Sequence, residues 1–356
     1  MIKKMIIIFI LVFTSIVLSV CIGNAFISPK EIISIFVYKI FSPNLIDNKI
    51  NADIIFSIRF PRSILAFFVG ASLSLTGTVI QSVLRNPLAS VYNLGISSGA
   101  GLGASLLIIT GINFNRYMFT TMSILFAFIT VIFILFISNK IDKYMNNNSI
   151  ILAGIVISLF LYSVMSFFIY TFPKYSNQII LWQLGNLYLK NFADIFIIIL
   201  ISIIFLLILI RHSAVLDIMT FGDTTSLSLG VDARKMRIFF IIISSFITAI
   251  LVSFVGIIGF VDLISPHIAR KIFGAKHIVV IPISAIFGGI LLNISDIFSR
   301  IMVQGANIPI GIVTALIGAP FFLYVFFIDN KINNKVDNKV DNRKFKIKKI
   351  KNDNKK

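Results

Sequence analysis

Long apolar runs separated by short polar breaks make up most of this 356-residue chain. Many of these runs are close to the roughly 20 residues that an α-helix needs to cross the hydrocarbon core of a bilayer. A soluble protein with one very large core does not predict such a repeated run length. The pattern predicts ten membrane-spanning helices, near residues 5–27, 60–84, 91–111, 117–138, 149–172, 193–211, 236–257, 259–270, 278–298 and 308–328. The eighth run is short for a span, so hydropathy alone supports nine.

Composition agrees with an all-α, polytopic membrane protein. Hydrophobic residues make up 58% of the chain and 36 residues are Phe, which is more apolar mass than a soluble domain buries. The first run ends at Cys21 in a way that resembles a lipoprotein signal, but the bulky Val20 stands where a small residue is expected before cleavage. We therefore expect the first run to remain as an uncleaved span.

The distribution of Lys and Arg predicts the orientation of the spans. With ten spans and a cytoplasmic N-terminus, most of the 32 basic residues fall on the cytoplasmic side, and both termini lie there. Much of this bias comes from the end of the chain. We expect residues 1–328 to form the transmembrane domain and residues 329–356 to form a basic, disordered cytoplasmic tail. Beside a bilayer, contact of this tail with anionic lipid is favoured over nucleic-acid binding.

Several kinds of chemistry have no counterpart in the sequence. It has no G-x-x-x-x-G-K-[ST] loop to hold nucleotide phosphates, so the chain cannot hydrolyse ATP alone. The single Cys and the three scattered His residues exclude an internal disulfide and a Cys/His metal site. Asp262 and Asp296 are the acidic residues expected at membrane depth, and they do not suggest a proton relay. An ion-driven secondary transporter and an integral membrane enzyme are the alternatives, and each needs polar clusters that we do not find.

Two further patterns predict local structure. The segment S-P-K-E at 28–31 combines a capping hydroxyl, a proline suited to the first turn of a helix and a glutamate three residues after the serine. A short outer helix should begin there. Gly95, Gly99 and Gly103 recur every four residues and form one flat face on the third span. That face suits close packing against another helix, or the lining of a substrate passage.

Seven short motifs, in a fixed order, carry a resemblance to a known family. They are R-x-P-R at 59–62, Q-x-x-x-x-N-P-L-A at 81–89, L-G-x-x-x-G-A at 94–100, W-x-x-G at 182–185, L-G-V at 229–231, P-H-I-A-R at 266–270 and P-I-G-I-V-T-A-L-I-G-A-P-F-F at 309–322. Each motif alone is weak. The ordered set, from about Arg59 to Tyr324, resembles the FecCD-type permeases, the membrane subunits of ABC importers for iron-siderophores, haem and vitamin B12.

The resemblance implies ten spans, including the short eighth one, in a bacterial cytoplasmic membrane. It implies a second permease subunit, either a copy of this chain or a related one, two cytoplasmic ATP-binding subunits and an extracytoplasmic substrate-binding protein. ATP and Mg would bind to the partner ATPases, so this chain would have no cofactor, metal site or catalytic residue of its own. The implied cargo is a metal chelate, foremost an iron-siderophore, with haem and cobalamin as alternatives.

By this resemblance, Arg59, Arg62 and Arg300 lie on the outer face and contact glutamates of the binding protein. A planar guanidinium binds a carboxylate through two parallel hydrogen bonds and stays charged at any relevant pH, which suits a docking contact. Arg59 and Arg62 share a helical face if the helix continues through Pro61. The alternative is that these arginines anchor the ends of spans at the interface.

The long polar break at about 213–235 resembles the pair of short cytoplasmic helices that such permeases insert into an ATPase groove. Gly222 would permit the turn between the two helices, and Gly230 would end the second. Leu227 and Leu229 would supply apolar contact to the ATPase. The alternative is an ordinary solvated loop.

The N-P-L-A turn resembles the element that closes the passage on the cytoplasmic side, together with the start of the fifth span. The resemblance assigns Asn86, Leu88, Asn147 and Asn148 to this gate. A purely structural turn is the alternative, because proline ends a helix and an asparagine amide can cap freed backbone groups.

Two positions depart from the family pattern. Asp262 stands where the family usually has glycine, and Val91 stands where it usually has proline. A carboxylate near the outer end of a short helix must meet water, pair with a cation or contact substrate, and a helix N-terminus would also stabilise it. The sequence leaves these options open.

Overall fold

The computed structural model of the protein describes residues 2–25, 27–41, 48–111, 116–142, 145–187, 191–303, 305–325 and 327. The chain divides into two compact units, residues 1–314 and 315–356. Throughout the described ranges the regular secondary structure is helical, without strands. The first unit holds α1 (Ile2–Cys21), α2 (Pro29–Phe41), α3 (Lys49–Asp53), a π-helical turn (Ile54–Arg59), α4 (Phe60–Val83), a 3-10 helix (Val91–Leu94), α5 (Ile96–Thr110), α6 (Arg116–Ile141), α7 (Asn147–Thr171), α8 (Pro173–Gln183), α9 (Phe192–Arg211), α10 (Ser213–Thr220), α11 (Asp223–Ser228), α12 (Ala233–Val255), α13 (Val261–Phe273) and α14 (His277–Ile301). The predicted tail lies outside the described residues.

Several helices suit a membrane by length and composition. Six helices of the described chain are long and apolar enough to cross one: Lys49–Val83, Tyr117–Ile141, Asn147–Thr171, Phe192–Arg211, Ala233–Val255 and His277–Ile301. Three shorter apolar helices are Ile6–Cys21, Ile96–Thr110 and Ile310–Val325, the last of which runs from the first unit into the second. Each predicted span region contains a helix, the eighth being α13. The all-helical, multi-pass prediction is confirmed, while the number of ten spans stays a prediction.

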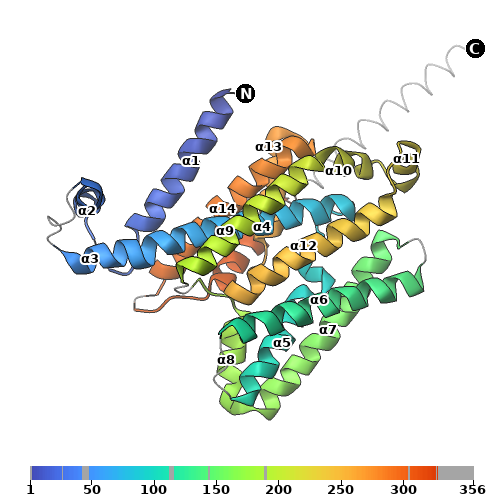
Figure 1. The fold of residues 1–356 in the computed structure, drawn as a ribbon, viewed down its shortest axis with the longest axis horizontal. Helices are drawn as coiled ribbons and strands as arrows, with labels where there is room; N and C mark the ends of the chain where they lie inside the picture. Colours follow the sequence, from blue (N-terminus) through green and yellow to red (C-terminus); the bar gives the residue numbers. More distant parts are fainter. Residues whose placement is uncertain are drawn as a thin grey trace, which may run out of the picture. The chain divides into compact units, whose positions relative to one another are not determined.

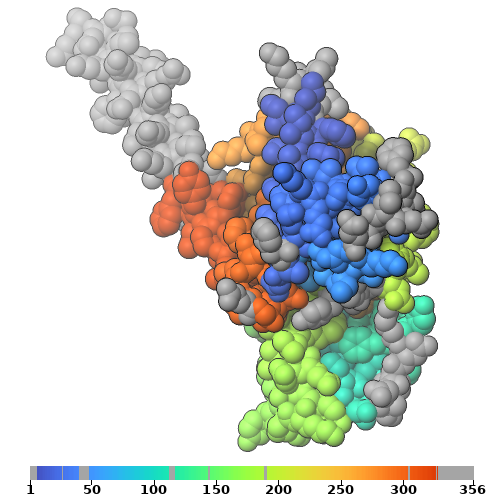
Figure 2. Space-filling model, turned by 90° about the vertical axis from the view of Figure 1, so that its left-hand side faces the viewer, coloured from blue at the N-terminus to red at the C-terminus, as the bar shows by residue number. Residues whose placement is uncertain are grey.

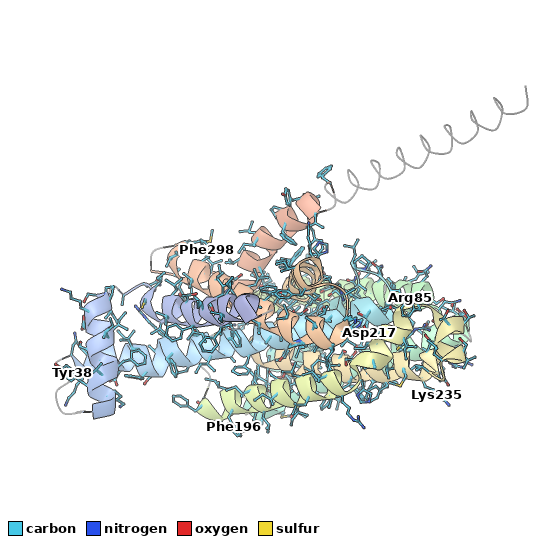
Figure 3. The ribbon with its side chains drawn as sticks, turned by 90° about the horizontal axis from the view of Figure 1, so that it is seen from above. Tyr38, Arg85, Phe196, Asp217, Lys235 and Phe298 are labelled. Atoms are coloured by element: carbon cyan, nitrogen blue, oxygen red, sulfur yellow. The ribbon has the colours of Figure 1, made fainter. Side chains whose placement is uncertain are left out.

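In the first unit, α4, α9, α12 and α14 run side by side, and α5, α6 and α7 form a neighbouring group (Figure 1). Among the described helices α4 and α14 share the most extensive contact, and α13 packs on both. Tyr38 lies at one end of this bundle, whereas Arg85, Asp217 and Lys235 lie at the other (Figure 3). We call these the α2 end and the α10 end. Figure 2 faces the α2 end, where the blue residues of α1–α3 and the light-green residues around α8 share one face.

α4 continues an apolar helix that begins earlier than predicted, at Lys49 rather than near residue 60. The chain passes through Pro61 by means of the π-helical turn before it, in which the Phe60 N–H donates to the carbonyl of Ile55. Proline lacks an N–H and crowds the carbonyl four residues earlier, so a wider turn relieves that clash. Arg59 and Arg62 therefore lie on one continuous helix, as the sequence analysis required. The start was missed because polar residues and Pro61 resemble a helix boundary.

Other local predictions are confirmed with additions. The Ser28 hydroxyl accepts the Glu31 N–H at 3.3 Å and caps α2. The Glu31 carboxylate accepts from the Asn51 amide at 2.6 Å, so it also ties α2 to α3. A Cβ on Gly103 would lie 2.7 Å from the Met122 carbonyl oxygen, which shows that the glycine face of α5 packs closely against α6.

Candidate functional site

The predicted pair of short helices is present at the α10 end. α10 ends at Thr220, α11 begins at Asp223, and Gly222 joins them with φ of 106°. Gly230, with φ of 82°, follows the end of α11. Side chains rarely adopt such positive φ values, so glycine at both positions lets the chain turn twice within a short segment. Gly222 thus stands at the turn between two short helices and Gly230 after the second, while the role of the pair in coupling stays a prediction.

Large apolar side chains project from this pair of helices. Leu227 is 68% exposed and Leu229 is 57% exposed, as predicted for an apolar contact surface. Phe221, which the sequence analysis did not single out, is 70% exposed beside them in sequence. An aromatic residue directly before the turn glycine is the signal that could have identified it. We call Phe221, Leu227 and Leu229 the apolar corner, and their exposed side chains are available for contact with a partner.

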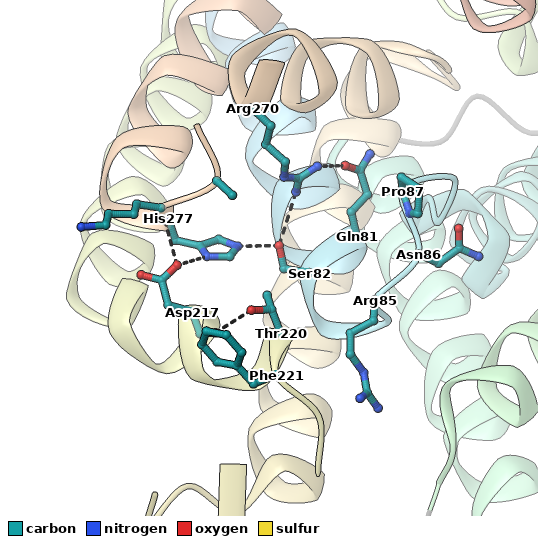
Figure 4. A pocket seen from close by; sticks show the side chains of 12 residues that line it. Gln81, Ser82, Arg85, Asn86, Pro87, Asp217, Thr220, Phe221, Arg270 and His277 are labelled. Atoms are coloured by element: carbon teal, nitrogen blue, oxygen red, sulfur yellow. Dashed lines mark hydrogen bonds and ion pairs between the residues drawn. The ribbon is translucent and has the colours of Figure 1, made fainter. Parts of the chain in front are cut away.

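α10 is fastened to the membrane helices by a chain of polar contacts (Figure 4). The Asp217 carboxylate accepts from the backbone N–H of His277 at 3.0 Å and lies 2.6 Å from its Nδ1. The Nε2 of the same buried ring lies 2.5 Å from the Ser82 hydroxyl. Arg270 donates to Ser82 Oγ at 3.3 Å and to the Gln81 side-chain oxygen. The contacts join α10, α14, α4 and α13 around a cavity of about 550 Å³.

α11 is fastened separately. Both carboxylate oxygens of Asp223 accept from Arg237 Nη2 at 2.8 Å, and Arg85 donates to the same carboxylate at 3.0 Å. Arg237 lies on α12 and is 1% exposed. It also donates to the carbonyl of Met145 at 2.9 Å. Sequence reasoning missed this cluster because its members are far apart in the chain.

The predicted gate residues meet at the end of α4. The Asn86 side-chain oxygen accepts the Leu88 N–H at 2.9 Å, which stabilises the turn locally. The Asn147 amide donates to the Leu84 carbonyl at 2.8 Å and so links the start of α7 to the end of α4. Leu88 is 54% exposed, and Asn148 is also exposed. The geometry brings the two segments together and leaves their gating role as a prediction.

The three predicted docking arginines gather at the α2 end, where they have partners within this chain. Arg59 donates to the carbonyls of Val20 (3.1 Å), Cys21 (2.9 Å) and Ala25. Arg300 donates to the carbonyls of Ser19 and Ile22, both at 2.9 Å. These carbonyls lie at or just beyond the last turn of α1, where helical carbonyls lack a partner within the helix. Two arginines therefore fasten α1 to α4 and α14.

Asp296 supplies the negative charge in this arginine cluster. Arg62 Nη2 lies 2.8 Å from its Oδ1 and Arg300 Nη2 lies 3.1 Å from its Oδ2, while Asp296 itself is 0% exposed. Two guanidinium groups thus pair with one carboxylate, and Arg59 lines the same cavity without an ion pair to Asp296. A cavity of about 240 Å³, lined by the arginines together with Asn24 and Asn307, lies beside them. The docking role stays a prediction.

Asp262 is a buried acid at the start of the short helix α13. It is 1% exposed in the first turn of α13, and the Ser90 hydroxyl donates to its carboxylate. Gln81 donates to its backbone carbonyl at 3.2 Å, which places Asp262 beside the last turns of α4. A serine hydroxyl is the polar partner that the sequence could not identify. Asp194, in the first turn of α9, is a further buried acid that the sequence analysis overlooked.

Two of the motifs meet through their backbones. The Ile310 N–H donates to the Gly185 carbonyl at 3.1 Å, and the Gly311 N–H donates to the Leu184 carbonyl at 3.0 Å. A Cβ on Gly185 would lie 3.2 Å from the carbonyl carbon of Ile257. The W-x-x-G and P-I-G segments thus form one close crossing with the chain after α12.

Comparisons with known proteins agree with this arrangement. The family model of the FecCD transport family matches residues 9–327. The Fe(3+)-citrate import system permease protein YfmE of Bacillus subtilis is 34% identical over 87% of this chain and 90% of its own length. The cobalamin import system permease protein BtuC of Halobacterium salinarum is 32% identical over 76% of this chain and 73% of its own length. A solved inward-facing conformation of a metal-chelate type ABC transporter superposes with a TM-score of 0.80 at 28% identity, covering 92% of this chain and 99% of that one.

Proposed function

Since the chain belongs to the FecCD transport family, we propose that it is the membrane permease subunit of an ATP-driven importer of a metal chelate. The observation that carries this proposal is the pair α10 and α11, which presents the apolar corner at one end of the bundle. An iron chelate, such as an iron-siderophore, is the proposed cargo, supported by the relative named for Fe(3+)-citrate import. Haem and cobalamin are the alternatives, and the relative named for cobalamin import supports the latter.

The proposed topology has ten spans in a bacterial cytoplasmic membrane, with both termini in the cytoplasm. The nine apolar helices support it, and α13, the short eighth span in chain order, brings the number to ten. Arg85 and Lys235 at the α10 end, together with Arg234 next to Lys235 in the sequence, favour a cytoplasmic location for that end. The α2 end then faces outward.

The proposed importer contains further subunits besides this chain. Two cytoplasmic ATP-binding subunits receive the apolar corner and hold ATP and Mg, because this chain has no phosphate-binding loop. A second permease subunit, either a copy or a related chain, forms the passage together with this one. The Asn86–Leu88 turn and the Asn147–Asn148 segment close that passage on the cytoplasmic side. ATP binding then opens the passage to one side at a time.

The proposal also includes docking of a substrate-binding protein at the arginine cluster, on the outer side of the membrane. The three arginines that line the cavity outnumber the single aspartate paired with two of them, and this excess of positive charge attracts acidic side chains. Reversing the charge of Arg59 or Arg300 cannot test docking alone, because both hold α1 in place. A photo-crosslinking residue at Asn24, which is exposed at the cavity, should capture the binding protein. The photo-crosslinking residue placed at the exposed Asn148 is the control. Equal capture of the binding protein at both positions would contradict docking at the arginine cluster.

The central test is ATPase activity in lipid discs. The chain is co-purified with its ATPase and assayed with and without the binding protein, alongside Gly222→Ala and Gly259→Ala. Gly222 has a φ of 106° that alanine rarely adopts, whereas Gly259 has open space around it and no such backbone. We expect stimulation by the binding protein to be lost in the first variant and kept in the second. Failure of the parent chain to assemble with any ATPase would favour an ion-driven secondary transporter instead.

A further inference from the structure

We propose that Asp223 is a positioning residue that transmits motion of the α10–α11 pair to both segments of the predicted gate, an inference that rests on the proposed function. Asp223 is the first residue of α11. Its carboxylate accepts from Arg237 through both oxygens at 2.8 Å and from Arg85 at 3.0 Å. One carboxylate therefore connects the coupling pair to α12 and to the end of α4.

The first route runs through Arg85 to the N-P-L-A turn. Arg85 follows the last residues of α4 and directly precedes Asn86, and its φ of 49° is in the left-handed region. An arginine in that conformation turns the chain sharply out of the helix. A Cβ on Gly222 would lie 3.1 Å from Arg85 Nη1, so the turn between α10 and α11 lies against the same guanidinium. Displacement of this turn therefore acts on the point where the chain leaves α4.

The second route runs through Arg237 to the start of α7. The buried guanidinium of Arg237 donates to the carbonyl of Met145 at 2.9 Å. Met145, with φ of 51°, stands two residues before Asn147, whose amide donates to the Leu84 carbonyl at 2.8 Å. Leu84 is the residue before Arg85. The two routes from Asp223 thus meet again at the end of α4 and close a ring of polar contacts.

Charge keeps this ring together when α11 moves. Arg237 is 1% exposed, and Asp223 supplies its carboxylate partner. Separating the two would leave a buried guanidinium without a counter-charge, which is strongly unfavourable. Asp223 is 39% exposed, so the carboxylate sits at the boundary between the buried ring and the surface that a partner would touch. The segments that carry Arg85 and Met145 should therefore follow α11 rather than detach from it.

The test uses the full complex in lipid discs and the variant Asp223→Asn. Spin labels at Leu88→Cys and Asn148→Cys, in a Cys21→Ser background, report the distance between the two gate segments. In the labelled parent we expect ATP to shift this distance. In Asp223→Asn we expect ATP hydrolysis to continue and the shift to disappear. Transport is measured with Fe(3+)-citrate as the probe cargo, and the amount moved per ATP should fall roughly tenfold.

Two further variants make the result decisive. Asp232→Asn removes the same charge at an exposed residue that pairs with Lys235 of the adjacent helical turn, and asparagine caps a helix as well as aspartate does. It should behave as the parent. Arg85→Gln keeps the Asp223–Arg237 pair and should lose part of the distance shift, which covers the case that Asp223→Asn does not assemble.

Three outcomes overturn the inference. A full distance shift with parental cargo per ATP in Asp223→Asn or Arg85→Gln refutes transmission through this ring. A parallel fall of ATPase, transport and thermal stability assigns Asp223 a structural role alone. A parent complex that neither hydrolyses ATP nor moves cargo overturns the proposed function itself, which separates that failure from the failure of this inference.

Discussion

Replacing Gly70 by alanine should force α4 and α14 apart. A Cβ at this position would lie 2.7 Å from Leu292 Cβ and 2.8 Å from the carbonyl carbon of Gly288. Ordinary van der Waals contact begins at 3.4 Å, so the added Cβ would lie about 0.7 Å too close to Leu292 Cβ. The obstacle includes main-chain atoms, which have no rotamer to change. The two helices must therefore separate.

The expected loss of stability in Gly70→Ala depends on how extensively α4 and α14 contact each other. An added methyl group in a packed core costs roughly 1–3 kcal/mol. A gap of about 0.5–1 Å forfeits about a quarter to a half of the dispersion attraction between the atoms that face it. Because α4 and α14 share the most extensive helix contact in the described chain, we place Gly70→Ala near the upper end, at about 3 kcal/mol.

Thermal unfolding of the purified chain in lipid discs measures this effect. At about 2 °C per kcal/mol for a chain of this length, the midpoint should fall by about 6 °C. Gly259→Ala is the matched control, because a Cβ there meets nothing within 4 Å and the backbone is not in the left-handed region. Equal midpoints for Gly70→Ala and Gly259→Ala would refute the reasoning, because α4 and α14 would then have separated without a loss of thermal stability.

Three further predictions concern polar and exposed groups. Asp296→Asn leaves two buried arginines without their counter-charge, at a cost of about 3–5 kcal/mol. The amount of folded protein recovered by size-exclusion chromatography should fall sharply, and a normal yield would contradict this. Asn147→Ala removes the bond to the Leu84 carbonyl, costs about 1–3 kcal/mol and should speed hydrogen exchange in the turn that follows; unchanged exchange would show that the bond is not maintained. Phe221→Ser should change stability by no more than about 0.5 kcal/mol yet prevent co-purification with the ATPase, and retained co-purification would remove this residue from the partner surface.

The short helices α10 and α11 could be predicted because the glycines that bound them are local signals. Gly222 and Gly230 mark two backbone conformations that other residues rarely adopt, and they bracket a short segment with exposed leucines. The same holds for the cap of α2, where serine and glutamate stand three residues apart. In these cases the residues that determine the structure lie within one or two helical turns of each other.

Long-range partners could not be predicted in this way. The sequence identifies Arg85 as a cation, but Asp223, its partner, is 138 residues away. Arg59 was assigned to a carboxylate of another protein, and in the structure it binds carbonyls at the end of α1. The seam between Gly70 and Gly288 likewise depends on which helices become neighbours. The chemistry of a side chain limits what it can bind, and the fold determines which of those possible partners lies next to it.

The crossing of the W-x-x-G and P-I-G segments has a consequence for how such chains diverge. Its hydrogen bonds join main-chain atoms, from Ile310 to Gly185 and from Gly311 to Leu184, so Leu184 and Ile310 take part without their side chains. Mutation can alter Leu184 or Ile310 without removing them, while a side chain at Gly185 meets the neighbouring backbone. The residues around this crossing can therefore change among related chains while the path of the backbone stays the same.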